Sequence, residues 1–229
     1  MRCDGCRSAE PWLAYRGGER KIADQLEVSR ETVRLGLKLA EEAGLVVRFP
    51  TRGTFVTVPR VEQDLGEMQT FQHTVRGLNL EPTYRLLVHE SSEADSRQAD
   101  RLEVPEGSRL LRIEALGMAS GLPMALYESY LPSWVMDLLP DGCDWGAAAS
   151  YQLTAKALGL KSLRAVQEFE AISIPKRMTQ TLRVKPGTPG FRCESLFTGP
   201  EQWSPVELRT AWYPGSRYHF TISRDVCLD

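Results

Sequence analysis

The chain has 229 residues, of which 42% are hydrophobic and 25% are charged, and its formal net charge is -2. This length favours two domains, and this composition is ordinary for a globular protein in water. No apolar run approaches the roughly 18 residues of a membrane helix, and the N-terminus lacks a signal-peptide pattern, so we expect a cytoplasmic protein with no membrane partner. The five cysteines are scattered and odd in number, which suits reduced thiols better than disulfides.

The net charge is unevenly divided along the sequence. Residues 1–60 carry 11 Lys and Arg against 8 Asp and Glu, whereas the remaining residues carry 17 against 22. A basic N-terminal part joined to an acidic remainder is typical of a nucleic-acid-binding domain attached to a second domain.

Two short helices are predicted near the N-terminus. Residues 19–26 (ERKIADQL) place their apolar side chains at helical spacing over about two turns. Ser29 suits the N-cap of a second helix, and Gly44 stands where a C-terminal cap belongs. In this second helix the predicted buried stripe consists of Val33, Leu37 and Ala40. A helix, a tight turn and a capped helix make a helix-turn-helix, whose second helix enters the major groove of DNA.

A β-hairpin is predicted directly after the second helix. Residues 45–49 and 54–58 are rich in β-prone side chains, and the Pro-Thr-Arg-Gly segment between them suits a tight turn. An arginine at the tip of such a hairpin can reach the minor groove or a phosphate, and the adjacent glycine lets the backbone approach closely.

The stretch VSRETVRLGLKLAEEAGLV followed by RGTFV resembles the winged helix-turn-helix of GntR-type transcription regulators. Carried over by position, the resemblance implies DNA contacts from Arg20, Ser29, Arg30, Thr32, Arg34, Arg52, Gly53 and Thr54. Arginine can bond guanine O6 and N7 bidentately, so we assign base reading to Arg30 and Arg34. The hydroxyls of Ser29 and Thr32 suit phosphate contacts.

The sequence departs from this family pattern at two places. Only 16 residues precede Gly17, so we expect either that the N-terminal domain lacks the first helix that the family usually has or that the true start lies upstream. Thr51 stands where the first glycine of the wing pattern belongs. Both departures leave open how stable the DNA-binding domain is and how tightly it binds DNA.

A second domain is predicted beyond a polar linker at residues 61–79. Residues 80–229 alternate between strand-like and helix-like stretches, and several strands follow one another through tight turns. The predicted strands cover residues 84–89, 110–118, 124–131, 166–174, 190–198, 205–213 and 218–223, and the predicted helices cover residues 96–102, 147–158 and 176–182. This order favours an α+β domain with helices packed on an antiparallel sheet.

The stretches RLEVPEGSRLLRIEAL, SGLPMALYESYLP and SPVELRTAWYPGSRYHF resemble the UTRA effector-binding domain of the HutC subgroup of GntR-type regulators. The resemblance spans roughly residues 80–222. It implies that the chain forms a homodimer through this domain and binds a small molecule in a cleft of the sheet. It also implies that the ligand relieves repression by rearranging the two DNA-binding domains.

The same resemblance points to a ligand site. By position, the effector contacts fall on Ala115, Gly117, Tyr127 and Glu207. Members that bind acidic effectors have arginines where Ala115 and Gly117 stand, and an acidic residue where Tyr127 stands. Because strand residues alternate between faces, Glu128 and Arg112 are expected on the opposite face from this site.

The lack of a guanidinium in the predicted cleft leads to a hypothesis about the effector. A phosphate or carboxylate would lose its charge-assisted partner there, so the effector is expected to be neutral or largely apolar. As an alternative, Glu207 only caps a polar network, and the domain serves dimerisation alone.

Other chemistry finds little support in the sequence. Cys3 and Cys6 make half of a zinc site, with no second pair or nearby histidine, so we expect no metal and no cofactor. The UTRA fold resembles that of chorismate lyase, which makes a small-molecule enzyme the alternative function. The sequence shows no set of acid, base and nucleophile that would support an enzyme. We therefore favour the regulator over the enzyme, and we expect a DNA-binding repressor that reads a pseudo-palindromic operator as a homodimer.

Overall fold

The computed structural model describes residues 12–14, 19–42, 46–49, 53–57, 60–200 and 204–225, and of residues 12–14, 42, 47–49 and 53–57 it describes the backbone only. The chain divides into two compact units, Met1–Arg60 and Val61–Asp229, which we call the N-terminal unit and the C-terminal unit. None of the helices in the described part of the chain is long and apolar enough to cross a membrane.

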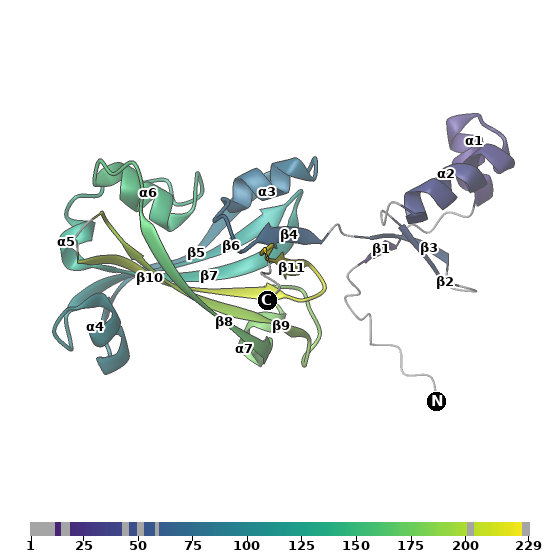
Figure 1. Ribbon diagram of the computed structural model, residues 1–229. Helices are drawn as coiled ribbons and strands as arrows, with labels where there is room; N and C mark the ends of the chain where they lie inside the picture. Colours follow the sequence, from purple (N-terminus) through teal and green to yellow (C-terminus); the bar gives the residue numbers. More distant parts are fainter. Residues whose placement is uncertain are drawn as a thin grey trace. The chain divides into compact units, whose positions relative to one another are not determined.

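The N-terminal unit combines two helices with a small sheet (Figure 1). Its elements are β1 (Trp12–Ala14), α1 (Glu19–Leu26), α2 (Arg30–Glu42), β2 (Val46–Phe49) and β3 (Gly53–Thr57). Strand β3 lies between β1 and β2 and pairs antiparallel with both. The predicted helix-turn-helix and the hairpin that follows it are therefore present.

The turn between α1 and α2 follows from local backbone chemistry. Glu27 has a left-handed φ of 52°, which ends α1, and the Val28 N–H donates to the Ala23 carbonyl at 3.1 Å. The Thr32 N–H donates to Ser29 Oγ at 3.1 Å, so Ser29 caps α2 as predicted. Ala23 and Val33 are buried where the two helices pack.

Several expectations for this unit lie outside the described residues. They are the helix cap at Gly44, the wing tip at Thr51 and Arg52, and most of the segment before Glu19 in which a first helix was expected to be absent. In the described part of that segment, β1 pairs with β3 in the register Leu13 to Val56.

The C-terminal unit is built around a six-stranded antiparallel sheet in the order β5-β6-β7-β10-β9-β8. Its strands are β5 (Pro82–Glu93), β6 (Arg109–Ala119), β7 (Leu122–Pro132), β8 (Arg164–Ser173), β9 (Pro189–Thr198) and β10 (Pro205–Pro214). Strands β4 (Val61–Asp64) and β11 (Tyr218–Thr221) form a separate parallel pair. The helices are α3 (Phe71–Gly77), α4 (Ser96–Leu102), α5 (Ser133–Met136), α6 (Ser150–Ala157) and α7 (Lys176–Thr179).

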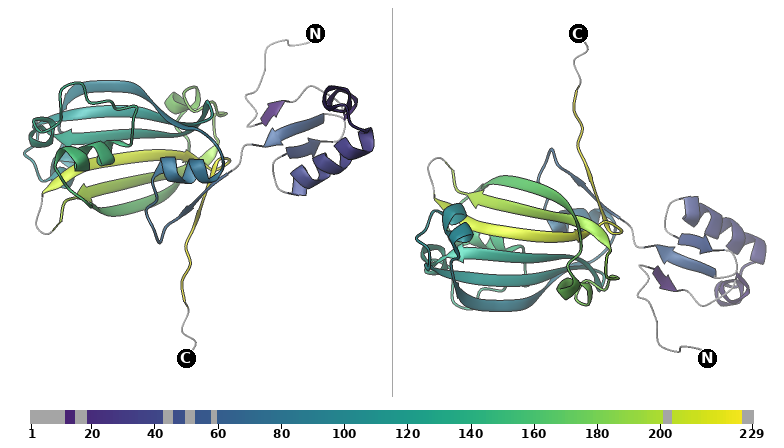
Figure 2. Two further views of the ribbon diagram at one scale, coloured as in Figure 1. Left: turned by 90° about the horizontal axis from the view of Figure 1, so that it is seen from above. Right: turned by 90° about the horizontal axis from the view of Figure 1, so that it is seen from below.

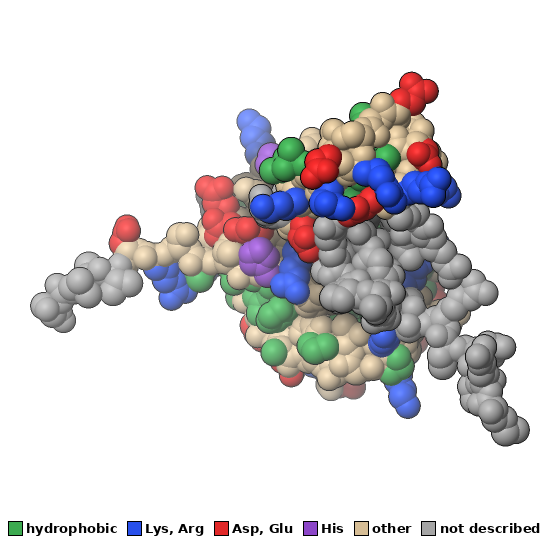
Figure 3. Space-filling view, turned by 90° about the vertical axis from the view of Figure 1, so that its right-hand side faces the viewer, with side chains coloured by type: hydrophobic (Ala, Val, Ile, Leu, Met, Phe, Trp, Pro, Cys, Tyr) green, Lys and Arg blue, Asp and Glu red, His purple; other side chains and the backbone are tan. Residues whose placement is uncertain are grey.

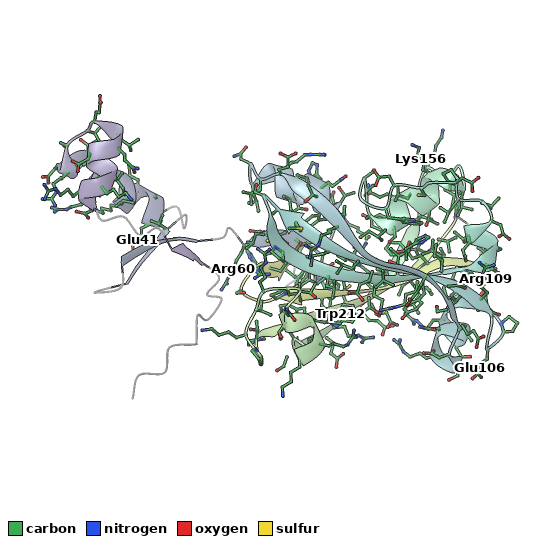
Figure 4. The ribbon with its side chains drawn as sticks, turned by 180° about the vertical axis from the view of Figure 1, so that it is seen from behind. Glu41, Arg60, Glu106, Arg109, Lys156 and Trp212 are labelled. Carbon is green, nitrogen blue, oxygen red and sulfur yellow. The ribbon has the colours of Figure 1, made fainter. Side chains whose placement is uncertain are left out.

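Helices cover both faces of this sheet. In Figure 1, α3 and α6 lie over one face and α4 and α7 over the other, and Figure 2 shows the six strands side by side from above and below. Alternate strand residues supply the two cores. Ile113 and Phe197 pack toward α5 and α6, whereas Leu126 and Trp212 pack against Met178 of α7. Trp212, labelled in Figure 4, extends from β10 to the α7 side.

The expectation of a linker at residues 61–79 is wrong, because this segment contains β4 and α3. Val61 is 1% exposed, and β4 pairs with β11. Thr70 caps α3 by accepting a hydrogen bond from the His73 N–H at 3.1 Å, and Phe71 and Val75 are buried. Such short elements bury only one or two apolar residues each, which is too few to produce a visible periodicity in a polar stretch.

Candidate functional site

The first candidate site is the exposed face of α2 in the N-terminal unit. Arg30, Thr32 and Arg34 are all exposed there, and the side chain of Arg34 is 62% exposed with its Nε 3.7 Å from Glu19 Oε2. Arg20 is exposed on α1. In Figure 3, the helices of this unit carry a row of Lys and Arg side chains with acidic side chains between them.

The remaining predicted DNA contacts are placed only in part. Ser29 Oγ accepts the Thr32 N–H and lies 2.8 Å from Thr32 Oγ1, so both hydroxyls take part in the N-cap of α2. Gly53 and Thr54 stand at the start of β3, where the structure describes their backbone, and Arg52 lies outside the described residues.

The second candidate site is a narrow cavity in the C-terminal unit, between the sheet and the segments β4, α3 and β11. The gaps between its wall atoms amount to about 460 Å³ when the open mouth is included, but the centre of a water-sized sphere can occupy only about 20 Å³ of it. A second lobe continues toward the start of α6, and the two lobes share Tyr84, Tyr127 and Arg209 in their walls. The cavity therefore lies on the face of the sheet that the resemblance indicated.

The sheet brings the four predicted effector residues together. Tyr127 lines both lobes, and Ala115, its partner in the β6–β7 register, lines the second lobe. A Cβ atom added at Gly117 would lie 2.8 Å from Tyr127 Cε2 and 3.3 Å from Phe71 Cζ. Two aromatic rings thus occupy the space that a side chain at position 117 would need.

Glu207 is fully buried on β10 beside the second lobe. Ser129 and Ser150 donate hydrogen bonds to its Oε1 at 2.7 and 2.5 Å, whereas Oε2 has no hydrogen-bond partner in the described part of the chain. Burial raises the pKa of the Glu207 carboxyl, and the charge of Arg209 and the two serine hydroxyls lower it to a smaller extent.

The cavity also contains Arg209, which the sequence reasoning missed. Its side chain is buried, and its guanidinium carbon lies 4.0 Å from the centroid of the Tyr127 ring and 5.3 Å from that of Tyr151. A signal was present, because residues 207 and 209 of one strand share a face. The expectation that the cleft has no guanidinium is therefore wrong, and the reason for a neutral or apolar effector falls with it.

Glu128 and Arg112 lie on the opposite face of the sheet, as expected. Arg112 bonds Glu128 Oε1 at 2.8 Å, Glu114 Oε2 at 3.0 Å and Glu90 Oε1 at 2.7 Å. None of these four residues is among those that line the two lobes of the cavity.

Aromatic rings form most of the remaining cavity wall. Tyr127 contacts Phe71, Tyr84 and Tyr213 at centroid distances of 6.0 to 6.2 Å, and Tyr213 contacts Tyr218 at 4.6 Å. Burial raises the pKa of these tyrosines, so each remains a neutral phenol that can donate a hydrogen bond.

Within the described part of the chain, no group of three or more His, Cys, Asp or Glu side chains could hold a metal ion. Cys3 and Cys6 lie outside that part. Cys143 and Cys193 are free thiols, as expected for these two.

Comparison with known proteins finds relatives along most of the chain. Residues 77–219 match the family described as UTRA domain, and residues 18–56 match that described as bacterial regulatory proteins, gntR family. The chain is 26% identical over 207 residues to the HTH-type transcriptional repressor NagR of Bacillus subtilis, covering 90% of this chain and 84% of the relative. It is 28% identical over 218 residues to the HTH-type transcriptional repressor PhnF of Mycolicibacterium smegmatis, covering 95% and 86%. The crystal structure of PhnF from Mycobacterium smegmatis matches with a TM-score of 0.70 at 27% identity, covering 98% of this chain and 96% of that one.

Proposed function

This chain belongs to the UTRA-domain regulators of the bacterial gntR family, and from that membership we propose that it is a homodimeric repressor released from DNA by a small molecule bound beside Arg209. The family consists of transcription regulators, so the chain is a regulator and the chorismate-lyase-like alternative is set aside.

The observation that carries the ligand-controlled function is the position of β4. The N-terminal unit ends at Arg60, and the next residue, Val61, already lines the cavity together with Gln63. Val61 is held there by its N–H, which donates to the Arg217 carbonyl at 2.7 Å. A ligand that enters the cavity contacts the segment through which the chain reaches the DNA-binding unit, which gives a covalent route for the signal.

The cavity also argues against a domain that serves dimerisation alone. Tyr84 Oη, Glu207 Oε2 and Arg209 Nε are buried around it without a hydrogen-bond partner in the described part of the chain. Buried polar atoms are rarely left unpaired in native proteins, so a cluster of them beside a cavity favours a polar ligand.

The roles proposed for the DNA contacts follow the chemistry of each side chain. Arg30 and Arg34 project from the start of α2 and suit guanine recognition in the major groove. Arg20 and Thr32 suit contacts to phosphate, while Ser29 is engaged in capping the helix. The wing residues Arg52, Gly53 and Thr54 complete the proposed interface at the minor groove or backbone. A dimer would read two half-sites of a pseudo-palindrome.

A mobility-shift titration against the DNA upstream of the chain's own coding sequence tests this function. The purified protein is titrated at two salt concentrations, with random DNA as the competitor. We expect saturable binding that resists the competitor and weakens steeply with salt, because phosphate counterions are released. Binding that random DNA abolishes would overturn the assignment of a sequence-specific repressor.

A further inference from the structure

Arg209 is a buried cation without an ion-pair partner. Within the described part of the chain, it forms no ion pair, its Nε has no hydrogen-bond partner, and its guanidinium lies over the rings of Tyr127 and Tyr151. A buried guanidinium is strongly penalised by desolvation unless it is paired and hydrogen-bonded. The two tyrosine faces offset only part of that penalty.

Arg217 shows how the same fold treats an arginine that serves structure. It is 1% exposed, and its guanidinium donates to the carbonyls of Leu182 at 2.6 Å and Arg183 at 3.0 Å, and also to that of Pro123. These bonds join the end of the α7 region to the start of β7. Arg209 makes no comparable bonds within the described residues, although it is buried almost as completely, and it lines a cavity.

The charges around the cavity limit the charge of a ligand. Among the residues that the structure describes, Arg209 is the one charged side chain that lines either lobe. Glu207, a buried acid on the same strand, lies within range of the charge of Arg209, which lowers its pKa against the larger effect of burial, and its Oε1 accepts hydrogen bonds from Ser129 and Ser150. A monoanion would neutralise Arg209, whereas a dianion such as a phosphate monoester would bring a second charge for which the described walls provide no cation.

The cavity walls also limit the shape of a ligand. Phe71, Tyr127, Tyr213 and Ala211 present apolar surface and ring faces. Tyr84 adds a hydroxyl that has no hydrogen-bond partner among the described residues. Ring faces stack favourably on flat groups, and the phenol hydroxyls can donate to carboxylate oxygens.

We propose that the effector is a small organic carboxylate, a monoanion whose carboxylate pairs with the guanidinium of Arg209 and whose flat apolar body lies against the tyrosine rings. This proposal rests on the ligand-controlled repressor proposed above and names its ligand class. The isosteric amide lacks the charge and should bind far more weakly, because a charge-assisted bond to a buried guanidinium is among the strongest polar contacts available.

Matched ligand pairs test the charge requirement with the full chain. Melting temperature is measured with benzoate and benzamide, 4-hydroxyphenylacetate and its amide, and phenyl phosphate, each at millimolar concentration. We expect the carboxylates to raise the melting temperature and the amides and the phosphate to leave it unchanged. Stabilisation by the amides or the phosphate that equals that by the carboxylates overturns the proposal, and so does the absence of any carboxylate effect.

Two arginine variants test whether the effect passes through Arg209. Arg209→Gln should weaken carboxylate binding by at least about tenfold, because it removes a charge-assisted hydrogen bond. Arg112→Gln is the matched control, because Arg112 lies on the opposite face of the same sheet, away from the cavity, and pairs with Glu128. Preference for carboxylate that survives in Arg209→Gln, or that is lost equally in Arg112→Gln, refutes the assignment. If Arg209→Gln fails to fold, Arg209→Lys retains the charge without the planar fork and should bind carboxylates measurably less tightly.

The mobility-shift assay separates this inference from the proposed function. If the chain binds operator DNA but does not distinguish carboxylates from amides, the repressor function is retained and the carboxylate proposal is refuted. If the chain distinguishes carboxylates from amides but does not bind operator DNA, the carboxylate site is retained and the repressor function is refuted. When both are present, the carboxylate should release operator DNA from the parent chain and from Arg112→Gln, and not from Arg209→Gln.

Discussion

Replacing Gly117 by alanine tests whether the aromatic rings fill the space beside β6. Gly117 has no positive φ, so the added methyl group acts through contact alone. Its Cβ would lie 2.8 Å from Tyr127 Cε2 and 3.3 Å from Phe71 Cζ. The Tyr127 ring cannot turn away freely, because the guanidinium of Arg209 covers one face and Tyr84 and Tyr213 lie against it. Overpacking of this kind costs roughly 1–3 kcal/mol, and we expect about 2 kcal/mol here.

Urea denaturation of the full chain, followed through the unfolding transition of the C-terminal unit, measures this loss. Gly77→Ala is the control, because an added Cβ there meets nothing within 4 Å, and it should change stability by less than about 0.5 kcal/mol. In a Tyr127→Leu background the clash with the ring is absent, so Gly117→Ala should lose most of its cost. A full loss that persists in that background, or no loss in the parent, would refute the steric reasoning.

Three further predictions concern both units. Arg34→Ala should weaken specific operator binding by about 1–3 kcal/mol and relax sequence preference, and an equal loss on random DNA in the mobility-shift assay would contradict base reading. Ser29→Ala should destabilise the N-terminal unit by about 1 kcal/mol in a circular-dichroism melt, and Ser29→Asp should restore it, because aspartate is also a good N-cap. Burial raises the pKa of Glu207, so the folded state holds this proton more tightly than the unfolded state does. The parent should therefore lose stability relative to Glu207→Gln as pH rises from the ordinary carboxyl range through the raised pKa, and the two should converge at lower pH; parallel melting curves across pH would contradict this.

The parts of the fold that were predictable are those specified by neighbours in sequence. Ser29 caps a helix by bonding the N–H of Thr32, three residues on, and the buried position of Val33 follows from helical spacing. The strands β6, β7 and β10 are runs of ten or eleven residues, most of them buried, so their existence was predictable from the apolar side chains and the turns between them. Which of their residues share a face then follows from the two-residue period of a strand. The segment β4 was not readable, because its place is decided by pairing with β11, more than 150 residues away in the chain.

The part of Arg209 in the effector site was not predicted, for a different reason. The faces of Tyr127 and Glu207 followed from strand alternation, and by the same rule Arg209 shares the face of Glu207. The alternation of faces along one strand does not tell which residue of a neighbouring strand a given side chain will contact. The β7–β10 register sets Tyr127 opposite Ala211, and this small residue leaves room for the Arg209 guanidinium to lie over the tyrosine ring.

Gly117 and Arg209 are therefore best understood together. An arginine at position 117 would collide with the rings of Tyr127 and Phe71, so with these rings in place the cation has to come from another strand. Arg209 on β10 supplies it and uses the Tyr127 ring as its support. This arrangement makes a testable distinction between the two residues. Tyr127→Phe keeps the ring and should retain carboxylate binding, whereas Tyr127→Leu removes the support of the guanidinium and should weaken binding even though Arg209 remains, as a titration with benzoate can measure.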